Sequence, residues 1–202
     1  MKTTKKALLL ALCAVLLVVS TVFATMAYLT STTKVVTNTF TVGNVKITLD
    51  EAPVNEYGKV VEGDRRTENT YKLIPGHSYT KDPTIHVVAG SEECWLFVKV
   101  SNPLVDIIAS KTISEQMETN GWRIVDAENN ICANIDKVDA RTATAAIDVP
   151  VFGSFTITNN ANVADYNGMT ITVQAYAIQA DGFDTYAEAW EAAPSSWTPD
   201  AN

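Results

Sequence analysis

An alternation of apolar and polar residues over 169–177 constrains the fold of this 202-residue chain more than any other feature. A period of two predicts a β-strand with one buried face. The apolar positions of this strand are Met169, Ile171, Val173, Ala175 and Ala177. Because Asn167-Gly168 comes directly before it, we expect a tight turn to lead into the strand.

Similar patterns recur along the chain, and Thr, Val and Ile, which favour pleated sheet, dominate them. In 39–49 the apolar positions change phase across Gly43-Asn44, and a bulge at Gly43 would restore a common inward face. The run 95–98 is almost continuously apolar, which is typical of a central strand covered on both faces. Shorter alternating runs contain Ile85, Val87, Val151, Phe155 and Ile157.

Two short helices are expected beside the strands. Asn102-Pro103, followed by an apolar stripe of Leu104, Ile107 and Ile108, predicts a helix that ends near Asn120-Gly121. Thr185 and Glu188 have capping-box spacing and predict a second helix, which Pro194 ends. This helix is expected to cover one end of the strand layers with the shared face Tyr186, Ala189, Trp190 and Ala193.

Many short strands with few helices predict an all-β fold, an antiparallel β-sandwich of jelly-roll type. A chain of this length buries a substantial core as one domain. We expect this domain to span 43–202, with an insert around 103–147, and to follow an N-terminal signal-peptide helix.

Residues 1–27 have the three-part layout of a secretory signal peptide. Three lysines precede an apolar run that starts at Ala7, Ser20-Thr21 interrupts it, and small residues close it. Cleavage between Ala27 and Tyr28 is the favoured interpretation, and it leaves Tyr28 as the new N-terminus. The alternative is an uncleaved membrane anchor, since 7–27 is just long enough to cross a hydrocarbon core of roughly 30 Å.

The net charge is −8, and it excludes one class of partner. The signal segment holds three lysines and no acid, so 12 basic and 23 acidic residues remain after its removal, a net charge of −11. Such a surface repels phosphate backbones, so we expect no nucleic-acid partner. Neutralising carboxylates lowers the repulsion between copies, so any self-assembly is expected to respond to pH and salt.

Removal of Cys13 with the signal leaves Cys94 and Cys132. In an oxidising compartment these two residues can form a disulfide, and the alternative is two free, buried thiols. Neither cysteine has a second Cys or His at zinc-ligand spacing.

Catalytic motifs are missing from the sequence: it has no HExxH, no Gly-rich phosphate loop and no GxSxG elbow. His77 lies in a Pro75-Gly76 turn and His86 alternates outward, so both are interpreted as surface or sheet-edge residues. The acidic turns 126–130 and 159–167 offer oxygen ligands for calcium but lack EF-hand spacing, and solvated turns are the favoured interpretation. We therefore predict no enzyme, cofactor or metal site.

Three blocks of the sequence resemble the TasA and camelysin family, whose members are exported with a SipW-type signal peptide. The first block is 24–31 with 38–45, leading to Leu49-Asp50-Glu51. The second, 73–83, resembles the LxPGDxxTK element of the family, although His77 stands where an acidic residue is common. The third, 175–180 with Ala189-Trp190, is similar to the C-terminal strand and short helix of such proteins. The insert 103–147 departs from the family pattern.

The resemblance implies a dedicated signal peptidase, export from a Gram-positive bacterium, a jelly-roll domain and a role at the cell surface or in the extracellular matrix. In the TasA branch, fibres form when the N-terminal segment of one subunit adds as a strand to the next. The matching segment here is 28–42, with candidate assembly residues Tyr28, Leu29, Val35, Val36, Phe40 and Val42. The alternatives are an intramolecular first strand or a leader up to about Asn38.

Three functions from different classes follow. The favoured one is a secreted, non-catalytic structural protein of the bacterial cell surface or biofilm matrix, whose partner is a second copy or a companion matrix subunit. The second is a monomeric surface binding module or adhesin, motivated by the acidic surface and by Trp122 and Trp197 near polar segments. The third is a zinc endopeptidase, because camelysin relatives have been classed as metallopeptidases. Membrane contact is expected only through the signal segment.

Overall fold

The computed structural model describes residues 30–32, 45–109, 111–194 and 197. Within these ranges the chain is mostly antiparallel β-structure with a few short helices, which confirms the all-β prediction. The largest sheet has the order β1-β10-β5-β7-β6. Its strands are β1 (Thr30–Thr32), β10 (Thr172–Gln179), β5 (Cys94–Ser101), β7 (Ile131–Asn134) and β6 (Trp122–Asp126).

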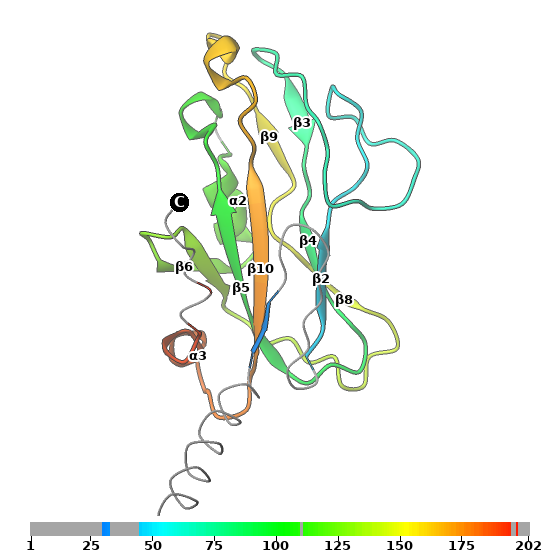
Figure 1. Ribbon diagram of the computed structural model, residues 1–202, viewed down its shortest axis with the longest axis vertical. Coiled ribbons are helices and arrows are strands. Elements are labelled where there is room, and N and C mark those ends of the chain that lie inside the picture. Colours follow the sequence, from blue (N-terminus) through cyan, green and yellow to red (C-terminus); the bar gives the residue numbers. More distant parts are fainter. Residues whose placement is uncertain (1–29, 33–44, 110, 195–196, 198–202) are drawn as a thin grey trace, which may run out of the picture.

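The described ranges also contain two smaller antiparallel sheets. A three-stranded sheet has the order β2-β4-β8, formed by β2 (Ile47–Asp50), β4 (Thr84–Val87) and β8 (Ile147–Pro150). A two-stranded sheet pairs β3 (Ser78–Thr80) with β9 (Ser154–Thr156). In Figure 1, β2, β3, β4 and β8 lie to one side of the long strands β5 and β10.

One apolar core joins the five-stranded sheet to the three-stranded sheet. Leu96 and Val98 of β5, and Val173 of β10, belong to the same buried cluster as residues of β2 and β4. The predicted alternation of β10 is confirmed at Ile171, Val173, Ala175 and Ala177, which are all buried. The exception is Met169, which is 48% exposed because it precedes the strand.

The other face of the five-stranded sheet is also covered. Trp95 and Phe97 of β5 and Tyr176 of β10 pack against Trp197 and α3 (Tyr186–Glu191). β5 is therefore buried on both faces, as its continuous apolar sequence predicts. The prediction that α3 covers one end of the strand layers is wrong, because α3 lies against this outer face.

Local sequence explains one helix and only part of the other. The capping box of Thr185 and Glu188 is present, and α3 begins after Thr185 as predicted. The single helix predicted between Asn102 and Gly121 is wrong, since the chain instead forms a 3₁₀ turn, η1 (Val105–Ile107), and then α2 (Ile113–Thr119). The interruption comes from tertiary pairing, because Ile108 is extended and bridges to Ile157.

The segment 103–147, expected as an insert, supplies β6 and β7 to the five-stranded sheet. A second 3₁₀ turn, η2 (Val163–Tyr166), precedes β10. The expected bulge at Gly43, the signal peptide 1–27 and most of the segment 28–42 lie outside the described residues.

Candidate functional site

The described part of the predicted assembly segment is β1, and it pairs with the edge of β10 in the same chain, which confirms the alternative of an intramolecular first strand for these three residues. The antiparallel register sets Thr30 opposite Ile178 and Thr32 opposite Tyr176. β1 therefore runs along the last residues of β10, and the side of β10 that it occupies is the one not taken by β5. The candidate residues Tyr28, Leu29, Val35, Val36, Phe40 and Val42, and the cleavage pair Ala27-Tyr28, lie outside the described ranges.

A groove of about 1010 Å³ lies beside the first residues of β10. Its walls come from β10 and the residues before it, from the end of β2 and from the segment 66–73. β2 is an edge strand of its own sheet, so the groove opens between two sheet edges. Its lining mixes charged and polar residues with apolar ones, which include Leu49, Leu73, Leu104, Phe155, Val163, Ile171 and Val173.

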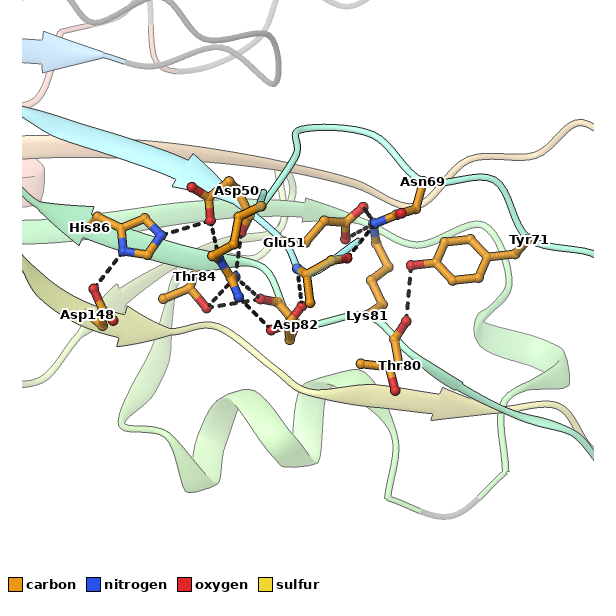
Figure 2. Close-up of polar contacts among 12 residues, drawn as sticks. Asp50, Glu51, Asn69, Tyr71, Thr80, Lys81, Asp82, Thr84, His86 and Asp148 are labelled. Atoms are coloured by element: carbon orange, nitrogen blue, oxygen red, sulfur yellow. Dashed lines mark hydrogen bonds and ion pairs between the residues drawn. The ribbon is translucent and has the colours of Figure 1, made fainter. Parts of the chain in front are cut away.

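A buried ion pair holds the wall formed by β2 and the segment 66–73. Lys81 Nζ lies 2.8 Å from Glu51 Oε2, and the two side chains are only 11% and 5% exposed. Asn69 Nδ2 donates to the other oxygen of Glu51, Oε1, at 3.0 Å. Tyr71 donates its hydroxyl to the Thr80 carbonyl at 3.1 Å, and burial, together with nearby Glu51 and Asp82, raises the pKa of Tyr71 well above its ordinary value. Figure 2 shows these residues side by side.

A second polar network covers the outer side of the three-stranded sheet. His86, on the central strand β4, has its ring nitrogens 2.8 Å from Asp50 Oδ1 on β2 and 2.6 Å from Asp148 Oδ1 on β8. Carboxylate oxygens only accept, so both bonds form when both ring nitrogens carry hydrogen. Burial lowers the pKa of His86, but the bonds to the two aspartates outweigh burial and raise it above its ordinary value.

Arg65 extends this network toward the groove. Its guanidinium contacts the carboxylates of Asp50 and Asp82 and donates to Thr84 Oγ1 at 3.1 Å. Figure 2 shows Asp50 between His86 on one side and Asp82 on the other. The end of β2 is therefore fastened to β4 and to the loop before β4 by charged groups on its outer side.

Cys94 and Cys132 are both free in the structure. Cys132 lies opposite Val98, four residues along β5 from Cys94, a separation of about 13 Å at the usual rise per residue. A disulfide needs Cα atoms within about 7 Å, so the disulfide considered from the sequence does not form within this sheet, and the alternative of two free thiols agrees with the structure. Burial raises the pKa of Cys94 to about 12 and that of Cys132 to about 11, which leaves both as unreactive thiols.

Trp122 and Trp197, which motivated the adhesin hypothesis, are 1% and 0% exposed. Trp122 belongs to the core and donates Nε1–H to the Pro150 carbonyl, and Trp197 packs on the outer face of β10. Neither ring is available at the surface to bind a ligand.

The remaining predicted positions have ordinary partners. His77 follows the predicted turn, its Nε2 lies 2.9 Å from the Tyr57 carbonyl, and its ring packs against Tyr79. Asp126 accepts from the backbone and side chain of Asn129 within its turn, and these bonds lower the pKa of Asp126. No group of three His, Cys, Asp or Glu side chains within the described ranges is placed to hold a metal ion.

Sequence reasoning missed both polar networks. Glu51 and Lys81 are 30 residues apart, and His86 and Asp148 are 62 residues apart, so no local spacing connects them. The one indication in the sequence is that these residues fall in the blocks that carry the family resemblance. Lys81 lies in the block 73–83, and Asp50-Glu51 closes the first block.

No family model, no curated protein and no solved structure matches the chain. In the part of the chain that the structure describes, no helix has the length and apolar character needed to cross a membrane.

Proposed function

We propose that this chain is a secreted, non-catalytic structural subunit of the bacterial cell surface or biofilm matrix, a β-sandwich of jelly-roll type that forms fibres by N-terminal strand addition. The observation that carries the proposal is the pairing of β1 with β10 beside a groove that is lined in part by apolar side chains. The same edge that pairs with Thr30–Thr32 continues into that groove. A longer strand from a second copy would gain both backbone hydrogen bonds and apolar burial there.

The register of β1 predicts how such a donor strand would lie. Extended along β10, it would set Val35 opposite Val173 and Val36 opposite Thr172. Residues opposite each other in an antiparallel pair share a face. Val173 is buried in the core on the groove side, so Val35 would point into the groove and Val36 away from it.

The composition of the segment supports this role. Between Tyr28 and Val42 the only charged residue is Lys34, which by the same alternation would lie on the outward side of the docked strand with Val36. The inward positions Thr33, Val35 and Thr37 are β-branched and suit a pleated strand. A strand of this pattern would bury no charge in the groove.

The test compares protein 28–202 with protein 43–202 by negative-stain electron microscopy and light scattering. Both samples are concentrated and taken through a mild acid step, so that repulsion between acidic subunits does not prevent assembly. Fibres from 28–202 and folded monomers from 43–202 are the expected result. Circular dichroism of 43–202 is the control, because an unfolded truncation would give the same loss of fibres.

Monomers from both proteins after the acid step would overturn the proposal. Fibres from both would also overturn it, because assembly would then not depend on the segment 28–42.

A further inference from the structure

An amine, a carboxylate and a carboxamide meet in the wall of the groove. Lys81 Nζ lies 2.8 Å from one oxygen of Glu51, and Asn69 Nδ2 lies 3.0 Å from the other. Figure 2 shows the ends of the Lys81 and Asn69 side chains converging on this carboxylate. Glu51 as a whole is 4% exposed and the Lys81 side chain is 11% exposed, so the group is shielded from water.

The carboxamide of Asn69 is held in one orientation by the backbone. Its Oδ1 accepts from the Val54 N–H at 3.0 Å, and its Nδ2 also donates to the Ala52 carbonyl at 2.9 Å. These bonds fix the plane of the amide and polarise its carbonyl. An N–H directed at a carbonyl oxygen is the placement that stabilises negative charge on that oxygen during nucleophilic attack.

The surroundings are aromatic on the Lys81 side. Lys81 Nζ lies 5.9 Å from the centre of the Tyr71 ring, and Tyr71 packs edge-on against Tyr79 and Phe155. The Glu51 carboxylate lies within hydrogen-bond reach of the Lys81 ammonium and is placed to take a proton from it. The neutral amine is the nucleophilic form of lysine.

A buried ion pair alone gives little net stability, because desolvation offsets the attraction of the charges. The Asn69 carboxamide satisfies the second oxygen of this carboxylate, and two backbone bonds hold that carboxamide beside the ion pair. These features match the requirements of acyl transfer: a nucleophile, a proton carrier and a polarised acyl carbon.

We propose that Lys81 and Asn69 become joined by an intramolecular isopeptide bond, with Glu51 as the proton carrier. Glu51 takes one proton from the Lys81 ammonium, and the free Nζ attacks Cγ of Asn69. The negative charge that forms on Oδ1 is held by the Val54 N–H. Glu51 then gives its proton to Nδ2, the Cγ–Nδ2 bond breaks, and ammonia leaves with a further proton from Nζ as ammonium. The reaction needs no oxidant, reductant or co-reactant.

The bond would join two segments that lie 12 residues apart in the sequence. Lys81 lies between β3 and β4, whereas Asn69 lies in the segment 66–73 that forms one wall of the groove. The link would close a short loop that contains Tyr71 and Tyr79. It would thereby reduce the conformational freedom of the unfolded chain. This inference concerns the single subunit and does not depend on fibre assembly.

Intact-protein mass spectrometry of 28–202 tests the proposal directly. The expected mass is lower than the sequence mass by one ammonia. Trypsin should then fail to cut after Lys81 and should release 67–72 joined to 73–99. A full sequence mass, with free peptides 67–72 and 73–81, would overturn the proposal.

Peptide mapping also separates this bond from another source of ammonia loss. Asn167-Gly168 is a sequence that can cyclise with release of ammonia, and it lies in the tryptic peptide 142–202. A mass deficit confined to that peptide would overturn the proposal as well.

Two variants test the roles of the residues. Lys81→Arg keeps the positive charge beside Glu51 but offers no attacking amine, and Glu51→Gln keeps the shape but removes the proton carrier. Both are expected to have the full sequence mass and a lower melting temperature than the parent. Lys72→Arg is the matched control, because Lys72 is exposed, and it should keep the ammonia deficit. Retention of the cross-linked peptide in Glu51→Gln would overturn the role assigned to Glu51.

Discussion

The two edges of the five-stranded sheet are built in opposite ways. At one edge, β6 is broken by a bulge between Ile124 and Asp126, and α2 packs beside it. Arg123 is exposed there and donates to the Glu118 carbonyl of α2 at 2.8 Å. At the other edge, a short strand, β1, pairs with β10 next to an apolar groove.

A bulge and exposed charges are common means of preventing one sheet edge from pairing with another molecule. The β6 edge carries both, whereas the β10 edge leads into a groove with apolar side chains such as Ile171 and Val173 in its lining. If copies of such a molecule join by strand addition, the contact is head to tail, and it gives open chains when the rotation between subunits does not close a ring. The contrast between the edges therefore gives the proposed fibre its direction.

The largest effect is expected from a charge placed on the groove side of the donor strand. Val35→Asp would bury a carboxylate without a partner, at a cost of about 3 kcal/mol, so assembly should weaken roughly a hundred-fold. Val36→Asp is the matched control, because the register of β1 points that position outward. Sedimentation over a concentration series measures both. Equal loss in the two variants would contradict the register.

A smaller effect is expected from a substitution that allows the edge strand β6 to pair with another molecule. Arg123→Val removes the bond to the Glu118 carbonyl and should destabilise the fold by about 1 kcal/mol. It also creates a continuous apolar run, 123–125, on an edge strand, so protein 43–202 with this change should self-associate without its N-terminal segment. Light scattering measures the association and urea unfolding the stability. A variant that stays monomeric would show that the bulge alone closes this edge.

Through His86, the free energy of unfolding should depend on pH. Its pKa is raised in the folded state, so its stabilising effect is complete below the ordinary value of 6.5 and is lost as pH rises through the folded value. His86→Gln should lower the free energy of unfolding by about 1 kcal/mol below pH 6.5, with a discount for the exposed Asp148.

The measurement is urea unfolding of parent and variant at several pH values. The difference between them should vanish at alkaline pH, where His86 is neutral in both folded and unfolded chains. The same difference at every pH would mean that packing, and not charge, explains the effect of His86.

The smallest effect is expected from Ile124→Thr on β6. Ile124 is 69% exposed, so its replacement should change the free energy of unfolding by less than about 0.5 kcal/mol. Fibre assembly should be unchanged, because the proposed strand addition takes place at β10 and not at β6. Thermal unfolding and electron microscopy check both expectations. A loss of fibres would assign the β6 edge a role in assembly.

Local patterns predicted the parts of this fold that local physics controls. The alternation of Val173, Ala175 and Ala177 located β10, and the capping box at Thr185 located the start of α3. The helix expected after Asn102 failed because Ile108 pairs with Ile157, a contact between residues distant in sequence.

The candidate site depended on such distant contacts throughout. The groove forms where the ends of β2 and β10 meet, and the triad of Glu51, Asn69 and Lys81 is assembled across as many as 30 residues. A period or a spacing along the chain cannot report these pairings, because they are set by strand register and by how the sheets pack.

The aromatic cluster on the outer face of β10 should give the protein a spectroscopic signal for strand docking. Three of the four tryptophans, Trp95, Trp190 and Trp197, lie in one cluster there, while Trp122 lies in the core on the other side of the sheet. Trp197 stacks on Tyr176 with ring centres 5.0 Å apart, and Tyr176 is the residue opposite Thr32 of β1. Indole emission and near-ultraviolet ellipticity should therefore change when a strand docks on β10, so subunit joining can be followed by light without an added label.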